Sequence, residues 1–270
     1  MNNFEFRQYL NLLHIAESHP SVNALTEILH AHLNVFPFEN ISKLYYLKKD
    51  NSRTIPGLEQ FLRGARDNHF GGTCYALNYY LNQLLTTMGY QVKLCGADMN
   101  NPDVHVVNIV TIGGKEYITD AGYAAPFSVP LPRYLREPFS VSSGVDSWIL
   151  LPKDSMGRSR VEQFHKGELQ HSYLVKPAPR QIGDFSEVIA DSFRPEATFM
   201  NAIVLVRYDG ENSHVIRNRE YSTTQNGVTH KLSLQTPAHL IETISHVFGI
   251  PPEISQVALE GFSFPGNSQK

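Results

Sequence analysis

The sequence predicts an α+β fold in which helices come first, strands follow, and a mixed α/β segment ends the chain. Up to Gly89 apolar residues recur at the helical period of about 3.6, and from Tyr90 the period shortens towards two. The final part of the chain contains both periods. We therefore expect three regions: helical over 1–89, strand-rich over 90–185 and α/β over 186–270.

Two amphipathic helices are expected in the first region. The first, NALTEILHAHL, has four apolar residues on one face: Leu25, Ile28, Leu29 and Leu33. The second runs from Ala76 to Met88 with its leucines on one face, and Gly89 is a natural C-terminal stop.

Strands dominate the next part of the chain. Strand patterns are found in three segments, YQVKLCGAD, HVVNIVTI and KEYITDAGY. The prolines of LVKPAPRQI end the middle region near residue 180. In the last region NAIVLVRYDG predicts a buried strand. REYSTTQNGVTHKLSL predicts a hairpin around Asn226-Gly227, and PAHLIETISHVFGI predicts an amphipathic helix.

The composition is that of a soluble globular protein, with 41% hydrophobic and 18% charged residues in 270. The net charge of −3 and the scattered lysines and arginines argue against nucleic acid as a partner. No apolar run approaches the roughly 18 residues of a membrane span, and MNNFEFRQYL lacks a signal-peptide pattern. Two cysteines make no disulfide framework, so we expect a cytoplasmic protein with reduced thiols and no membrane partner.

One cysteine stands at an unusual place, in FGGTCYALN. Thr73 is a good N-cap, which makes Cys74 the first helical residue, where free N–H groups and the helix dipole favour a thiolate and could stabilise an oxyanion. Gly71 and Gly72 leave room for a close approach to the backbone. The alternative interpretation is that Cys74 is a small buried hydrophobic residue that follows a glycine turn. Cys95, in mid-strand, is expected to be core.

A histidine and an aspartate are expected to meet across a hairpin. If Gly113-Gly114 form a two-residue turn, His105 faces Gly122, and Asp120 is the diagonal neighbour of His105 on the same face. Gly122 would leave space above the imidazole ring. A three-residue turn would break this pairing. The alternative interpretation is an ordinary solvated His–Asp pair on an exposed sheet face.

The other histidines are expected to carry no site. His30 and His32 are two apart on a helix and cannot share a face. No group of His, Cys, Asp and Glu has metal-ligand spacing, so no metal is expected.

Several blocks resemble the arylamine N-acetyltransferase family. Its fingerprint is Arg-Gly-Gly-x-Cys-x-Glu-x-Asn, then a histidine on a strand, then Asp-Val-Gly-Phe-Gly after a hairpin. Here these are FGGTCYALN, DVHVVNIV and TDAGYAAPF. The family pattern also matches four further segments: FPFEN, FRPEATFMN, the C-terminal hairpin and the closing helix. The resemblance therefore spans nearly the whole chain in the same order.

The resemblance implies a helical bundle, a central β-barrel and a C-terminal α/β lid around a cysteine-protease-like Cys-His-Asp core. It implies a catalytic triad of Cys74, His105 and Asp120, in which the histidine holds a thiolate and the aspartate orients the ring. The implied reaction is ping-pong. The thiolate takes the acetyl group from acetyl-CoA and passes it to an arylamine, arylhydrazine or N-hydroxyarylamine, as in xenobiotic metabolism. Acetyl-CoA is thus a substrate, and no bound cofactor is expected.

The same resemblance implies two sets of binding residues. The acceptor slot would be lined by four aromatic residues: Phe38, Tyr123, Phe127 and Phe199. The CoA side would involve Val104, Gly122 and Ala124.

The chain departs from the family pattern at four positions. Phe70 replaces the arginine of the fingerprint and Ala76 its glutamate. If these two residues pair in the family, losing both together leaves no charge without a partner. Ala124 replaces a glycine, and Val104 replaces a frequent threonine, where the family approaches CoA and acceptor.

Three other functions therefore stay open. The first is an amide synthase or acyltransferase that uses another acyl-CoA or a carrier-bound donor. The second is a thiol hydrolase or transglutaminase-like enzyme, and the third an inactive protein that binds aromatic ligands. The acceptor amine and the oligomeric state are left open by the sequence.

Overall fold

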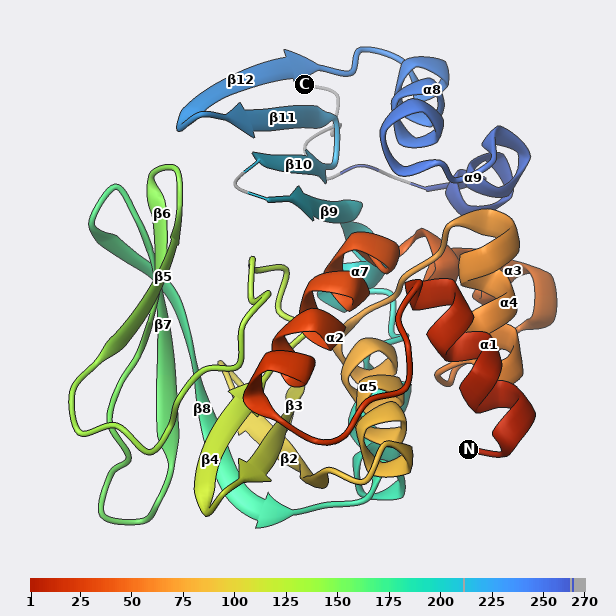
Figure 1. Cartoon of the computed structure of the whole chain (residues 1–270). Coiled ribbons are helices and arrows are strands. Elements are labelled where there is room, and N and C mark those ends of the chain that lie inside the picture. The colour runs from red at the N-terminus through yellow and green to blue at the C-terminus, as the bar shows by residue number, and fades with distance from the viewer. Residues whose placement is uncertain (211, 263, 265–270) are drawn as a thin grey trace.

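The computed structural model describes residues 1–210, 212–262 and 264, and it places helices first and two antiparallel sheets after them (Figure 1). The helices of the first region are α1 (Asn3–Leu13), α2 (Val22–Val35), α3 (Ile41–Asp50), α4 (Leu58–Asn68) and α5 (Cys74–Thr87). The α+β class predicted from the sequence is confirmed.

Helix α2 shows how the sequence pattern and the packing differ. Ser21 caps its start, where the hydroxyl accepts a hydrogen bond from the Ala24 amide at 3.1 Å. Leu33, expected on the apolar face, is only partly buried. The inner position one turn after Ile28 belongs instead to His32, which is fully buried. His32 thus takes a buried position at which the helical pattern predicts a hydrophobic residue.

His32 is held by Tyr9 of α1 and by Phe36, the residue that follows α2. Its Nε2 lies 3.0 Å from the Tyr9 hydroxyl, and its ring centroid lies 4.6 Å from that of Phe36. Burial lowers the pKa of His32 from 6.5 to about 3. The imidazole is therefore neutral in the folded protein, and protonation favours the unfolded chain.

This gives a pH dependence of stability with a definite sign. Below pH 6.5 the His32 imidazole binds a proton in the unfolded chain but stays neutral in the folded protein. The free energy of unfolding therefore decreases as the pH falls from 6.5 towards 3. Urea unfolding at pH 7.5 and pH 5.0 should show the parent losing about 2 kcal/mol more than His32→Leu. His30→Leu, exposed on the same helix, should lose as much as the parent. Equal losses in parent and His32→Leu would refute this account.

The larger sheet has seven strands in the order β4-β3-β2-β8-β7-β6-β5. Its strands are β2 (Gln91–Asp98), β3 (His105–Ile112), β4 (Lys115–Thr119), β5 (Phe139–Ser143), β6 (Asp146–Leu150), β7 (Ser159–His165) and β8 (Glu168–Pro179). Gly113 and Gly114 have φ of +56° and +75°, and Ile112 pairs with Lys115. The predicted two-residue turn and its register are confirmed.

The closed barrel implied by the resemblance is a curled open sheet instead. Strand β8 pairs with β7 along its first part and with β2 along its last part, so the sheet turns at β8 (Figure 1). The outer edge of β4 is taken by another segment, because Ile118 and Leu131 exchange two hydrogen bonds of 2.8 Å. That edge is therefore occupied and does not pair with β5 to close a barrel.

The smaller sheet joins the first and last regions of the chain, in the order β1-β9-β10-β11-β12. Its strands are β1 (Phe38–Glu39), β9 (Val204–Asp209), β10 (Asn212–Arg217), β11 (Glu220–Gln225) and β12 (Val228–Ser233). Phe38 pairs with Val206, so the edge strand comes from the FPFEN block between α2 and α3. Asn226 and Gly227 form the predicted tight turn, with φ of 50° and 76°.

Further helices complete the fold around these sheets. They are α6 (Ser186–Asp191), α7 (Thr198–Asn201), α8 (Pro237–Phe248) and α9 (Pro252–Leu259). Helix α9 packs on α3 and α8, and this core includes Ile41, Ile203, Leu240 and Ile244. Helix α5 packs against β2 and β3, which brings its first turn to the start of β3 (Figure 1).

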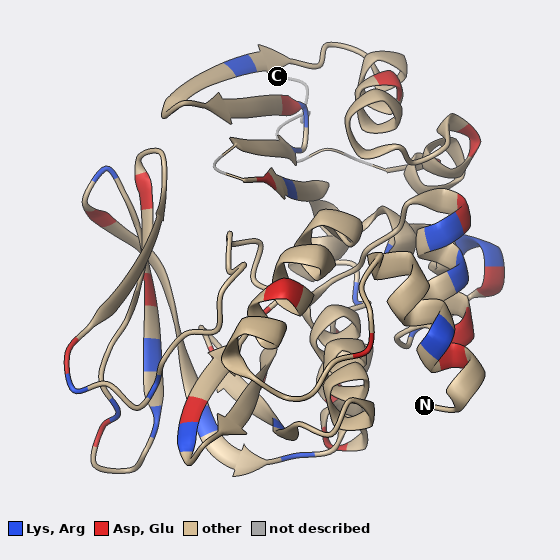
Figure 2. Ribbon diagram, viewed as in Figure 1, with Lys and Arg blue, Asp and Glu red and all other residues tan. Residues whose placement is uncertain are grey.

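Charged residues of both signs are interspersed on the outer elements in the view of Figure 2. No helix among the described residues has the length and apolar character needed to span a bilayer.

Candidate active site

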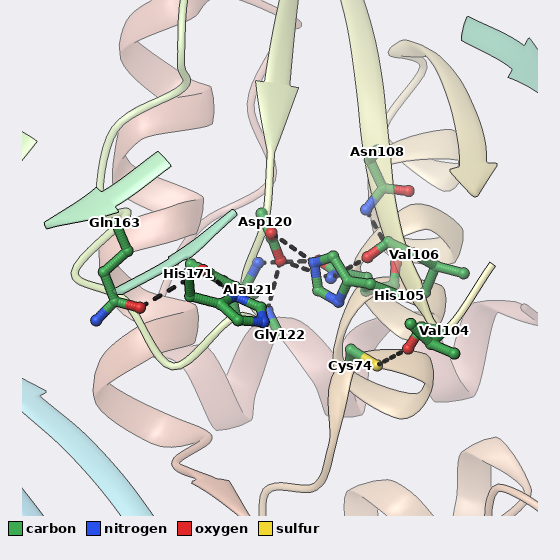
Figure 3. A network of polar contacts seen from close by, with 12 residues as sticks. Cys74, Val104, His105, Val106, Asn108, Asp120, Ala121, Gly122, Gln163 and His171 are labelled. Carbon is green, nitrogen blue, oxygen red and sulfur yellow. Dashed lines mark hydrogen bonds and ion pairs between the residues drawn. The ribbon is translucent and has the colours of Figure 1, made fainter. Parts of the chain in front are cut away.

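Cys74 is the first residue of helix α5, as predicted. Thr73 before it has extended backbone angles, and its carbonyl accepts the Leu77 amide at 3.1 Å, although its side chain makes no capping hydrogen bond. The cysteine is 7% exposed, and its thiol donates to the Val104 carbonyl with the two heavy atoms 3.9 Å apart (Figure 3). The sulfur therefore lies at the positive end of the helix, next to the start of β3.

The two glycines before Cys74 make room for the protein's own chain rather than for a ligand. A Cβ on Gly71 would overlap the Pro37 carbonyl oxygen and lie 2.8 Å from the carbonyl carbon. Gly72 forms a parallel bridge with Phe38, donating to the Pro37 carbonyl at 3.3 Å and accepting from the Glu39 amide at 3.0 Å. The expectation that they leave the cysteine's backbone open is corrected: β1 packs there.

Glu39 ties the cysteine loop to helix α3. Its Oε1 accepts the Gly71 amide at 3.2 Å and its Oε2 the Ser42 amide at 2.8 Å, and the side chain is fully buried. Burial raises the pKa of Glu39, while these hydrogen bonds act in the opposite direction. The next residue, Asn40, donates to the Ala202 carbonyl at 2.7 Å, so the FPFEN block holds both the loop and the last region.

The two residues that replace the family's charged pair lie in apolar surroundings. Phe70 is 2% exposed and packs on Tyr45 and Tyr46, with ring centroids 5.8 and 5.7 Å away. Ala76 is buried in the core of the helical region. Both positions are therefore buried, where a charge without a partner would carry a desolvation cost.

His105 and Asp120 meet beside the cysteine, as the hairpin register predicted. His105 Nε2 donates to Asp120 Oδ2 at 2.7 Å, and both residues are only 1% exposed (Figure 3). The alternative of a solvated pair is therefore wrong. Strand β4 ends at Thr119, earlier than expected, because the chain turns so that Asp120 Oδ1 accepts the Gly122 amide at 3.0 Å.

Asn78 connects the cysteine's helix to this pair, and the sequence reasoning missed it. One turn after Cys74, its Nδ2 donates to Asp120 Oδ1 at 2.8 Å and to the Val106 carbonyl at 2.7 Å. Its Oδ1 accepts the Ala121 amide at 2.9 Å. The available signal was an asparagine within an apolar helix, four residues after the cysteine and thus on the same face.

The electrostatics favour a charged pair. Burial lowers the pKa of His105, but the Asp120 carboxylate and Cys74 outweigh burial and raise it to about 10. Burial raises the pKa of Asp120, yet the imidazole and the Asn78 amide bring it below its usual value. The stabilisation from His105 is therefore complete below pH 6.5 and is lost as the pH rises through 10. With Nε2 bound to Asp120, Nδ1 is the nitrogen left for Cys74.

The four aromatic residues expected at the acceptor slot form two pairs. Tyr123 lies beside His105, with ring centroids 5.7 Å apart, and stacks on Phe127 at 6.2 Å. Phe127 itself is 1% exposed. Phe38 and Phe199 contact each other edge to face at 5.5 Å, between β1 and α7.

The residues expected near CoA are placed by contacts within the protein. A Cβ on Gly122 would lie 2.5 Å from the Cys74 Cα, so this glycine lets the hairpin approach the helix and does not open space above the imidazole. Ala124 has φ of +59°, a left-handed conformation that explains the family's glycine there, and its carbonyl accepts the Tyr208 hydroxyl at 3.0 Å. Val104 contributes the carbonyl that faces the thiol.

Cys95 contrasts with Cys74. It is fully buried in the larger sheet, and burial raises its pKa to about 12, which suits the predicted core role. No cluster of three or more metal-binding side chains is found within the described part of the chain.

Comparison with known proteins gives the class. A family model described as N-acetyltransferase matches residues 21–257. The chain therefore belongs to the arylamine N-acetyltransferase family, a family of acyltransferases whose acyl-donor substrate is acetyl-CoA.

Individual proteins match this chain at low sequence identity. Proansamycin X synthase of Amycolatopsis mediterranei is 27% identical over 246 residues, which cover 84% of this chain and 90% of that protein. Arylamine N-acetyltransferase 2 of Mus musculus is 28% identical over 134 residues, 46% of this chain and less than half (42%) of that protein. The arylamine N-acetyltransferase of Mycobacterium marinum, solved in complex with CoA, has a TM-score of 0.79 at 20% identity, covering 96% of this chain and all (100%) of that one.

Proposed function

We propose that this protein is an arylamine N-acetyltransferase. It carries an acetyl group from acetyl-CoA, through a thioester on Cys74, to the nitrogen of an arylamine, arylhydrazine or N-hydroxyarylamine. The observation that carries the proposal is the buried His105–Asp120 pair, joined at 2.7 Å beside a cysteine that begins a helix. Family membership supports the choice of acetyl transfer.

In the first half-reaction the Cys74 thiolate, paired with the His105 imidazolium, attacks the acetyl carbonyl carbon. The oxyanion forms near the free N–H groups at the start of α5. The bond from this carbon to the CoA sulfur then breaks, and the leaving thiolate takes the His105 proton. The products are acetylated Cys74 and CoA thiol, so one thioester replaces another.

In the second half-reaction the acceptor nitrogen attacks the Cys74 thioester. His105, now neutral, takes the proton from that nitrogen, and the thiolate leaves to restore the ion pair. A weakly basic aromatic amine suits this step because it is unprotonated and nucleophilic at neutral pH. Asp120 holds the ring through Nε2, so Nδ1 remains free to accept and return the proton.

We place the acceptor slot beside Tyr123 and Phe127, with Phe38 and Phe199 on the side of β1. The contact of Tyr123 with His105 supports this placement. CoA would lie near Val104, Gly122 and Ala124. The regions 1–89, 90–185 and 186–270 would act as the helical, sheet and lid units of a cytoplasmic enzyme.

A second candidate is an amide synthase or acyltransferase that takes another acyl group from CoA or a carrier. The alignment with proansamycin X synthase, over 90% of that protein, favours keeping this candidate. Ala124 also places a methyl group where the family has a glycine, which changes the space next to the Asp120 loop.

Intact-protein mass spectrometry after brief mixing with acetyl-CoA, without acceptor, tests the proposal. The parent and Cys95→Ala should gain one acetyl group, and Cys74→Ala none. An added arylamine or arylhydrazide should discharge the adduct. A folded parent that gains nothing from acetyl-CoA but reacts with a longer acyl-CoA or carrier-bound acyl group would support the second candidate. No adduct from any donor would contradict both, leaving a thiol hydrolase or an inactive binding protein.

A further inference from the structure

Tyr123 carries a hydroxyl group where the family fingerprint has phenylalanine. The fingerprint block Asp-Val-Gly-Phe-Gly corresponds to TDAGYAAPF here, so this chain adds an oxygen at the end of that ring. The ring centroids of Tyr123 and His105 are 5.7 Å apart. The added oxygen lies 2.7 Å from His171 Nδ1 and 3.5 Å from Gln163 Oε1. It is therefore built into a polar cluster of Tyr123, Gln163 and His171.

The other two members of the polar cluster come from neighbouring strands of the larger sheet. Gln163 on β7 and His171 on β8 are cross-strand partners. Because side chains alternate along a strand, Gln163 shares a face with Val161, and His171 shares it with Tyr173; both Val161 and Tyr173 are fully buried. The Tyr173 ring lies 5.0 Å from that of His105. Gln163 and His171 are only partly buried, so they stand at the rim of the sheet face that packs on His105.

The imidazole of His171 has one nitrogen left for a ligand. The ring stacks on Tyr123 with the two centroids 5.8 Å apart, and its Nδ1 faces the tyrosine hydroxyl. Within the described part of the chain, His171 Nε2 makes no hydrogen bond. Burial lowers the pKa of His171, and the positive charge of His105 acts in the same direction, so the imidazole is neutral at pH 7. In a neutral imidazole one nitrogen donates a hydrogen bond and the other accepts one.

A hydroxyl group is the ligand that matches this nitrogen. If Nδ1 accepts the Tyr123 proton, Nε2 donates, and if Nδ1 donates, Nε2 accepts. A hydroxyl group can do both, so it fits either form. The polar cluster contains no charged side chain, so it offers nothing to offset the charge of a ligand carboxylate. In the view of Figure 3, His171 and Gln163 lie on the side of Asp120 away from Cys74, so they would meet the end of an acceptor that is remote from its nitrogen.

We propose that His171 is a specificity-determining residue, which hydrogen-bonds a hydroxyl group on the aromatic ring of the acceptor. Tyr123 and Gln163 hold its imidazole at the rim of the slot. The preferred acceptors are then hydroxylated arylamines, with the hydroxyl group remote from the nitrogen that takes the acetyl group. This inference rests on the acceptor slot of the proposed function and names a substrate class for it.

The test compares the acetylation of 4-aminophenol with that of aniline. The ratio of their kcat/KM values is measured at pH 7.5 in the parent and in His171→Phe, which keeps a ring on Tyr123 but has no ring nitrogen. The ratio should fall about fivefold, through a higher KM for 4-aminophenol. The hydroxyl group also changes the reactivity of the amine itself, but equally in every variant. His165→Phe is the matched control, because His165 is exposed and its Nδ1 pairs with Asp146 at 2.7 Å; it should keep the ratio.

Tyr123→Phe is the second variant, and it serves if His171→Phe does not fold. It removes the hydroxyl group that holds His171 and restores the fingerprint residue, so it should lower the same ratio. The double variant should show no further fall, because the two side chains act as one hydrogen-bonded unit. Ratios equal to that of the parent in the folded variants would overturn the inference.

Binding of ligands without an amine separates this inference from the proposed function. The dissociation constants of 4-hydroxybenzyl alcohol and benzyl alcohol are measured by ligand-observed NMR. The parent should bind the phenol about fivefold more tightly, and His171→Phe should bind the two alike. A chain that accepts no acyl donor but shows this preference would uphold the role of His171 and reject only the acetyl transfer. A chain that transfers acetyl groups but shows no preference in either measurement would do the reverse.

Discussion

Replacing Asp120 with asparagine is expected to slow acetylation of Cys74 by about 10³–10⁴-fold while leaving the protein folded. The reason lies in how Asp120 uses its two oxygens. Oδ1 accepts from the Asn78 amide at 2.8 Å and the Gly122 amide at 3.0 Å, and Oδ2 accepts from His105 at 2.7 Å. Two fixed donors therefore hold one side of the carboxylate.

In Asp120→Asn those two donors keep the amide oxygen on their side and turn the NH₂ group towards His105. Nε2 must then act as an acceptor, and the ring proton moves to Nδ1, the nitrogen that serves Cys74. Such an imidazole cannot take the thiol proton. The imidazolium also loses the carboxylate that raises its pKa to about 10.

The measurement is the single-turnover rate of acetyl adduct formation, followed by rapid quenching and intact mass. Asp146→Asn is a matched control, because Asp146 also pairs with a histidine, His165, at 2.7 Å, but on the surface. It should react as the parent does. A rate in Asp120→Asn within tenfold of the parent, at an unchanged melting temperature, would show that Asp120 does not set the tautomer.

Local patterns predicted the elements that carry strong signals. The Gly113-Gly114 and Asn226-Gly227 turns have one favoured geometry, so the two hairpins and their registers followed from the sequence. Strands β5 to β7 and β10 had no such turn signal, and β10 shows no alternation of buried and exposed residues. The open form of the larger sheet depends on the pairing of Ile118 with Leu131, a long-range contact that no local pattern specifies.

The candidate site was predictable where residue type and spacing decide the chemistry. Cys74 at the helix start, and His105 with Asp120 across the hairpin, met both conditions. Asn78 and Glu39 were missed because their partners are mostly backbone amides and carbonyls, which a sequence does not place. For the same reason, glycines expected to give space to ligands proved to give space to the chain itself.

Replacing Gly71 with alanine is expected to destabilise the protein by about 3 kcal/mol and to slow acetylation about 100-fold or more. The new methyl group would overlap the Pro37 carbonyl, which is backbone and cannot rotate away. Relief requires β1 to move from the cysteine loop. That movement breaks the hydrogen bonds between Gly72 and both Pro37 and Glu39, at 3.3 and 3.0 Å.

The effect on activity follows because the same loop begins helix α5. A displaced loop moves Cys74 relative to His105, whose position is set separately by strand β3 and Asp120. Urea unfolding and the acetylation rate check the two parts. Gly183→Ala is the matched control, since its Cβ meets no atom within 4 Å, and it should change stability by less than about 1 kcal/mol. An unfolding midpoint for Gly71→Ala equal to that of Gly183→Ala would mean that β1 can move without loss of stability. The position of the cysteine loop would then not depend on the FPFEN block.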